Sequence, residues 1–124
     1  MRTDNLSMDG FVQKCELLTK QPGIRFAGIL DMMGNLIEGR FRSGLVPLKD
    51  ENQRKKMFME AILRVRTRQD FDENLGPVSY AAARRKKVVL MTFLLDNKVL
   101  FISAEPDIDI DDTARKVLQI LHLE

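Results

Sequence analysis

The sequence predicts an α+β domain, in which strands arranged as antiparallel hairpins are combined with helices. The first observation is the order of the patterns along the chain, which alternate between helical and strand-like spacing as helix, two strands, helix, three strands, helix. The second is that neighbouring strands are joined by short turns, which is typical of hairpins. A chain of 124 residues has room for one domain, which we expect to span residues 1–124.

The first helix is expected over 8–20. Phe11, Cys15 and Leu18 recur at helical spacing on one face. Pro22 closes the helix, because the residue before a proline is pushed out of the helical region. Cys15 is the single cysteine and lies on the apolar face, so we expect a packed thiol rather than a reactive one.

A hairpin should follow, with strands over 24–31 and 36–41. Gly34 and a following asparagine tolerate the backbone angles that hairpin turns require. Gly28 and Gly39 lie inside the strands, where glycine weakens local structure. Either a helix packs closely against them or a ligand approaches the sheet there.

A long second helix is expected from Asp50, which with Gln53 resembles a capping box, to about Asn74, before Gly76 and a proline. Its apolar stripe is formed by Phe58, Ala61, Ile62 and Val65.

The same helix carries two further apolar residues, Met59 and Leu63, at roughly 130° from the centre of the stripe. Isolated exposed apolar residues are ordinary. A surface for a partner or for self-association is the favoured interpretation, since Met suits adaptable contacts.

The rest of the chain predicts strands over 78–85, 88–95 and 98–104 and a helix over 111–123. The continuously apolar stretch 88–95 indicates burial on both faces and a central position. His122 lies near the end of the last helix, where a cation is favourable. The buried side of that helix is expected to be Ala114, Val117, Leu118 and Leu121.

The chemistry of common enzyme sites is missing from the sequence. It has one cysteine, one histidine, and neither a phosphate-binding loop nor a dinucleotide fingerprint. Asp107, Asp109 and Asp111 match the opening of a calcium loop, but Asp112 replaces its glycine and Leu118 its final glutamate. We therefore expect no catalytic residues, no metal and no cofactor.

The main basic cluster is Arg84, Arg85, Lys86 and Lys87. Three interpretations stay open: protection of a strand end from aggregation, an acidic protein partner, and nucleic acid. Nucleic acid is the weakest, because the net charge is only +2 and Tyr80 is the one aromatic residue near the cluster. The longest apolar run has eight residues, well below the ~20 of a membrane-spanning helix, so we expect no membrane segment and a cytoplasmic protein.

The order of elements, with the hairpin around Ile29-Leu30-Asp31 and Gly34-Asn35-Leu36-Ile37, resembles the roadblock family of dynein light chains and small-GTPase regulators. The resemblance covers about 24–123. It implies a five-stranded antiparallel sheet with the long helix on one face and the terminal helices on the other. Residues 25–28 and 103–107 also resemble a small uncharacterised archaeal family, which implies no activity.

The roadblock resemblance further implies dimers in which the long helices pair and edge strands join. Carried over, the interface would include Met59, Leu63 and Arg66 on the helix, and Val78, Tyr80 and Ala82 on the strand 78–83. The sequence departs from the family in the dense basic charge around the long helix, which includes Arg64, Arg66 and Arg68. Like charges at a two-fold axis oppose pairing unless acids such as Glu60 or Asp70 balance them.

The expected function is that of a non-enzymatic, dimeric scaffold or regulator that binds a small GTPase or similar switch protein, with the basic cluster steering an acidic partner. The alternative is a profilin-like domain that senses a small molecule, and a nucleic-acid-binding protein is less favoured.

Overall fold

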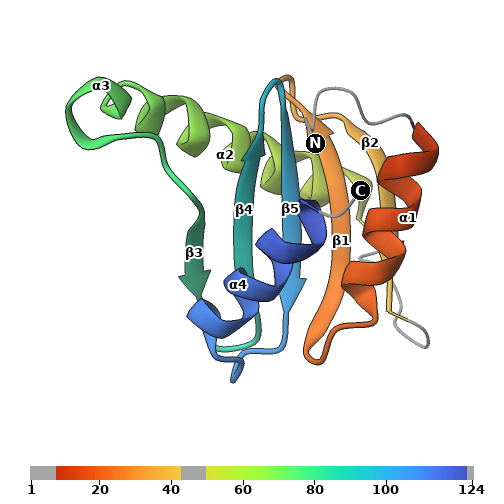
Figure 1. The fold of residues 1–124 in the computed structure, drawn as a ribbon. Coiled ribbons are helices and arrows are strands. Elements are labelled where there is room, and N and C mark those ends of the chain that lie inside the picture. The colour runs from red at the N-terminus through yellow and green to blue at the C-terminus, as the bar shows by residue number, and fades with distance from the viewer. Residues whose placement is uncertain (1–7, 43–49, 123–124) are drawn as a thin grey trace.

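The computed structural model describes residues 8–42 and 50–122, and its elements alternate as the sequence predicts (Figure 1). In chain order they are α1 (Met8–Thr19), β1 (Ile24–Asp31), β2 (Leu36–Phe41), α2 (Glu51–Gln69), α3 (Asp72–Leu75), β3 (Ala81–Arg84), β4 (Val89–Leu95), β5 (Lys98–Ala104) and α4 (Ile110–Leu121).

The five strands form one antiparallel sheet in the order β2-β1-β5-β4-β3. Figure 1 shows α1 and α4 on one face of this sheet and α2 on the other. The α+β class is therefore confirmed, as is the layer arrangement that the roadblock resemblance implies. Helix α2 crosses the sheet, and its C-terminal end extends with α3 beyond the edge strand β3 (Figure 1).

The core consists of two clusters, one on each face of the sheet. The cluster under α1 and α4 includes Cys15, Phe93 and Val117, which are almost inaccessible to solvent. The cluster under α2 joins its stripe residues Phe58, Ala61, Ile62 and Val65 to Phe26, Leu30, Val99 and Phe101 of the strands β1 and β5. The predicted stripe of α2 is thus confirmed as the buried side of this helix.

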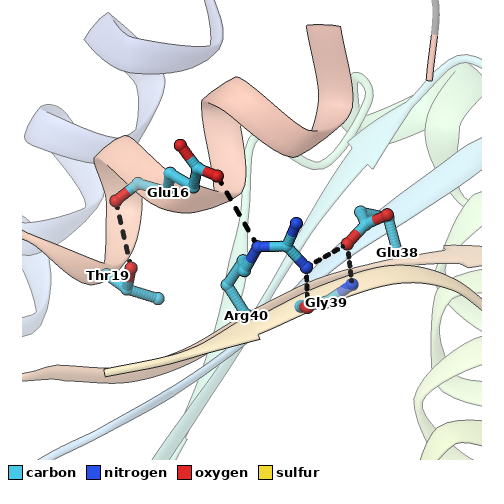
Figure 2. A network of polar contacts seen from close by, with 5 residues as sticks. All are labelled: Glu16, Thr19, Glu38, Gly39 and Arg40. Atoms are coloured by element: carbon cyan, nitrogen blue, oxygen red, sulfur yellow. Dashed lines mark hydrogen bonds and ion pairs between the residues drawn. The ribbon is translucent and has the colours of Figure 1, made fainter. Parts of the chain in front are cut away.

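Polar contacts join helix α1 to strand β2 on one side and to helix α4 on the other. Arg40 of β2 lies 2.6 Å from the Glu38 carboxylate through Nη1, and its Nε lies 3.7 Å from Glu16 of α1 (Figure 2). Lys14 donates from Nζ to the carbonyl of Ile120 at 2.7 Å, which ties α1 to α4. Cys15 between them is fully buried, and burial raises the pKa of its thiol to about 12. The expected packed thiol is confirmed.

The two strand glycines make room for an aromatic ring of the same sheet. A Cβ atom on Gly28 would lie 2.6 Å from Cζ of Phe26, and one on Gly39 would lie 3.0 Å from Cε1 of the same ring. Phe26 also packs on Phe41, with ring centroids 4.6 Å apart. The ring therefore explains both glycines, in place of the close helix or the ligand expected from the sequence.

Two boundaries differ from the prediction near the β3 edge. Helix α2 ends at Gln69 instead of Asn74, and no residue of α3 is buried. The physical reason is that the helix has passed the edge of the sheet, where no apolar surface remains for a continued stripe to cover (Figure 1). Strand β3 begins at Ala81 instead of Val78, after Gly76 with a φ of 81°.

Strand β4 is an interior strand, between β5 and β3, but contrary to the prediction it is not fully buried on both faces. The middle strand is β5, and burial along β4 alternates strictly. Leu90 and Leu94, on the face of α2, pack against the cluster under this helix but are only half-buried. The apolar run of β4 therefore includes residues that no helix of the described chain fully covers.

Helix α4 follows the acidic connector as expected, with small differences at its buried side. The Asp109 carboxylate caps it by accepting from the amide of Asp112 at 2.9 Å. Leu118 is half-buried and Ile120 takes the buried position. His122 is the exposed C-cap residue. Among the described helices, none has the length and apolar character needed to cross a membrane.

Candidate interaction site

The face of the sheet that carries α2 is hollowed beside this helix. A cavity of about 460 Å³ lies between the N-terminal half of α2 and the strands, and a smaller one of about 90 Å³ continues from it toward β3. The two share lining residues of α2 and the sheet, and we call them together the sheet groove. Its apolar lining includes Phe26, Phe41, Met57, Phe58, Leu90 and Phe101, with Ala81 and Ala83 at the β3 end.

The edge of the sheet groove is strongly basic. Arg25, Arg54, Arg85 and Lys87 line the larger cavity, and Arg64 and Arg68 line the smaller one. The single acidic lining residue in the described chain is Glu60. Glu60 pairs with Arg64 at 3.4 Å. Within residues 8–42 and 50–122, the charges of Arg54, Arg68, Arg85 and Lys87 have no carboxylate in ion-pair range, so the groove carries a net positive charge.

The basic cluster predicted from the sequence is the turn of the β3–β4 hairpin, and the structure divides it between two faces. Arg84 points to the side of α4, where it donates to the carbonyls of Pro106 and Ile108. Arg85 and Lys87 instead line the sheet groove on the opposite face, while Lys86 is exposed at the turn.

The helix residues predicted for a dimer form an exposed patch, which we call the outer stripe. Met59 and Leu63 expose 45% and 59% of their surface. The sulfur of Met59 lies over Gly34, in the β1–β2 turn, and Arg66 donates from Nη2 to the carbonyl of Met32 at 3.0 Å. The outer stripe therefore faces the β1–β2 turn, on the side of α2 away from the sheet groove.

The strand residues predicted for the same interface lie elsewhere. Val78 precedes β3 and is exposed, and Ala82 is exposed on the edge strand. The ring of Tyr80 stacks on Phe93 with centroids 5.8 Å apart, so it packs within its own chain. Since the outer stripe and β3 lie on different sides of α2, the structure does not bring the six predicted residues into one patch.

One apolar surface was missed by the sequence interpretation. Phe71 exposes 54% and Leu75 exposes 80% of its surface at the end of α2 and in α3. Three acidic residues stand among them: Asp70, Asp72 and Glu73. We call residues 70–75 the acidic corner. The signal was present in the alternation of apolar and acidic residues, but it was hidden by the expectation of one continuous helix.

Solved structures with the same fold have distant sequences. The roadblock/LC7 domain from Streptomyces avermitilis superposes with a TM-score of 0.68 at 14% identity, over 89% of this chain and 90% of that one. Myxococcus xanthus MglB gives 0.71 at 13% identity, over 94% and 91%. An MglB structure described as having a tetrameric arrangement gives 0.66 at 11% identity, over 89% and 86%. The chain thus has the roadblock/LC7 fold.

No curated protein matches the sequence. A family model described as a family of unknown function matches residues 3–124. The chain therefore belongs to that family of unknown function, DUF6659.

Proposed function

We propose that this chain is a non-enzymatic, dimeric scaffold that binds and regulates a small GTPase or a similar switch protein. The observation that carries the proposal is an edge strand, β3, whose outer side pairs with no other strand of the described residues, beside an apolar sheet groove and within a fold shared with MglB. An edge strand offers unpaired backbone groups, and proteins that keep one this open commonly pair it with another chain. The roadblock family, which the sequence resembles, includes regulators of small GTPases.

We assign the two sets of predicted interface residues to two contacts. Strand β3, with Val78, Tyr80 and Ala82 on and before it, is proposed to pair two copies. The outer stripe of Met59, Leu63 and Arg66 is proposed to contact the switch protein, because one flat interface cannot include both sides of α2. Arg85, Lys86 and Lys87 are proposed to steer acidic partners. Arg84 is not included, because it donates a hydrogen bond to the carbonyl of Ile108 in its own chain.

The first experiment is the solution mass by light scattering over a range of concentrations. A mass near twice 14.3 kDa that persists on dilution supports the dimer, and a monomer at all concentrations refutes it. Leu63→Glu distinguishes the two contacts. If this variant had a lower solution mass than the unmodified chain, the outer stripe would belong to the dimer interface and not to the contact with the switch protein. The same variant should lose binding to a GTPase from the same organism, loaded with GDP or with a non-hydrolysable GTP analogue.

The regulator proposal has its own controls. The chain alone should release no phosphate from GTP. Reversing Lys86 to Glu should slow association with the GTPase at low salt and leave it unchanged at high salt, since steering is screened by ions. Equal association rates for the variant and the unmodified chain at low salt would remove the steering role.

A small-molecule sensor is the second candidate, and the size of the sheet groove favours it. Its larger cavity of about 460 Å³ falls in the range of ~300–1,000 Å³ that is typical of ligand pockets. A small molecule that stays bound through purification and appears in native mass spectra would support this reading, and its repeated absence would weaken it.

A further inference from the structure

The floor of the larger cavity in the sheet groove is a row of side chains that crosses four strands. Phe41 of β2 lies opposite Phe26 of β1. Ser103 of β5 continues the row between Phe26 and Leu90 of β4, and all four residues line the cavity. Because neighbouring strands lie about 4.8 Å apart, this row is roughly 14 Å long, close to the length of an extended dodecyl chain.

The helix side of the cavity is apolar as well. Met57 and Phe58 of α2 line it, and the flexible methionine side chain adapts to ligands of varied shape. A nucleobase or another ring with several polar atoms would find few hydrogen-bond partners between these surfaces, which costs free energy. The lining therefore favours a ligand whose body is hydrocarbon.

The positive charge of the cavity is concentrated at one end of the sheet. The strand register brings the start of β1, which carries Arg25, to the same end as the β3–β4 turn, which carries Arg85 and Lys87. Arg25 lies 3.8 Å from the Glu105 carboxylate, so its charge is balanced. Arg85 and Lys87 have no carboxylate in ion-pair range within the described residues, so an anion of the ligand is favoured at this end.

The fourth basic side chain of the cavity, Arg54 of α2, has a buried hydrogen-bond donor without an acceptor. Its Nε is shielded from solvent, and no residue of the described chain accepts a hydrogen bond from it. A buried donor left in this state is costly and calls for an explanation. A bound oxyanion supplies one, because a carboxylate or phosphate accepts from two nitrogens of a guanidinium at once.

We infer that the larger cavity binds an amphipathic anion: a single hydrocarbon chain on the row of Phe41, Phe26, Ser103 and Leu90, with a carboxylate or phosphate head beside Arg54. Arg85 and Lys87 add attraction for the head. The inference rests on the second candidate of the proposed function, the small-molecule sensor, and gives that sensor a class of ligand. It needs neither a dimer nor a switch protein.

The first test is isothermal titration of the full chain with dodecyl phosphate and with dodecanoate, both below the concentration at which they form micelles. At least one of them should bind with a stoichiometry of one per chain, and the comparison assigns the head group. Dodecyltrimethylammonium has the same chain with the opposite charge, and inorganic phosphate has the head without the chain. Both should bind about tenfold or more weakly, because each lacks one half of the interaction.

Arg54→Gln tests the residue that contacts the head. It should weaken binding of the anion that the unmodified chain prefers about tenfold or more. Lys56→Gln is the matched control, since Lys56 is an exposed residue of the same helix outside the cavity and its loss changes the net charge equally. A merely structural role of Arg54 predicts the reverse pattern, in which Arg54→Gln lowers the midpoint of urea unfolding and leaves the affinity unchanged.

Met57→Glu tests the cavity through the helix side. A carboxylate inside the cavity repels the anion, so affinity should fall about tenfold or more. Met59→Glu is its control, because Met59 belongs to the outer stripe and does not line the cavity. It should leave the affinity unchanged. Circular dichroism checks the fold of each variant, and Arg54→Gln keeps the test decisive if Met57→Glu does not fold.

The outcomes separate this inference from the dimeric scaffold. A monomeric chain that binds dodecyl phosphate or dodecanoate would refute the scaffold and support the inference. A stable dimer that binds neither would overturn the inference and leave the scaffold standing. Equal binding of dodecyltrimethylammonium, affinity that Arg54→Gln leaves unchanged, or binding to phosphatidylglycerol vesicles without binding to either free anion would also overturn it.

Discussion

Replacing Gly28 by alanine should destabilise the chain mainly through one ring, that of Phe26. The new Cβ would lie 2.6 Å from Cζ and 2.7 Å from Cε2 of this ring, and 2.9 Å from Cδ1 of Leu36, all closer than van der Waals contact allows. The ring packs against Phe41 and Phe101, with centroids 4.6 Å and 6.5 Å away, so it cannot move aside without changing these contacts. Overpacking of this kind costs about 1–3 kcal/mol, while removal of a strand glycine returns about 0.5–1 kcal/mol. We expect a net loss of about 1–2 kcal/mol in the free energy of unfolding.

The double variant identifies the cause of that loss. In a Phe26→Leu background the clash with the ring is absent and only the end of the Leu36 side chain still has to move, so most of the cost of Gly28→Ala should disappear. The coupling between the two substitutions should be about 1–2 kcal/mol, measured by equilibrium urea unfolding at one protein concentration. Gly76→Ala is the control: its Cβ would meet no atom within 4 Å, but its φ of 81° disfavours alanine, so its cost should add to that of Phe26→Leu. Additive costs for Gly28→Ala and Phe26→Leu would refute the explanation of this glycine by the ring.

Three further predictions concern residues with single, well-defined contacts. Arg84→Ala should lower the free energy of unfolding by about 1–2 kcal/mol, because the guanidinium donates to two connector carbonyls, whereas Lys86→Ala should change it by less than about 0.5 kcal/mol in the same urea titration. Asp50→Ala should cost about 1 kcal/mol by removing the cap of α2, and Asp50→Asn should recover most of it. The pKa of Cys15 is raised to about 12, so the unfolded chain loses its thiol proton near pH ~8.5 while the folded chain keeps it. Stability should therefore fall between about pH 9 and 12, and this part of the slope should vanish in Cys15→Ala; a slope shared by both proteins in pH-dependent urea unfolding would contradict it.

The sequence was most informative where local chemistry decides the structure. The hairpin of β1 and β2 has the predicted bounds, because alternation and a Gly-Asn turn are sufficient to define it. The start of α2 is also where Asp50 indicates, since a cap depends only on the next few residues. The buried stripe of this helix was predictable for the same reason, as it follows from helical periodicity alone.

The errors arose where structure depends on the extent of the sheet. Nothing near Gln69 in the sequence marks the point at which α2 leaves the sheet, so the helix was predicted five residues too long. The surroundings of the outer stripe could not be predicted either. Helical periodicity gives the angle between this stripe and the buried stripe of α2, but it does not show which part of the chain lies beside it. Only the contacts of Met59 with Gly34 and of Arg66 with Met32 show that it faces away from β3.

The misjudged strand β4 explains why the candidate site was found in the structure and not in the sequence. A run of apolar residues predicts burial on both faces, but in the single chain the face of β4 toward α2 is only half-buried. If the amphipathic anion fills the sheet groove, Leu90 becomes buried and the original inference from composition is correct for the complex. Accessibility of the groove tests this directly: a hydrophobic dye such as ANS should bind the chain alone and should not bind the chain saturated with dodecyl phosphate. Equal dye binding by both would show that the apolar face of β4 stays open, and that its composition has another cause.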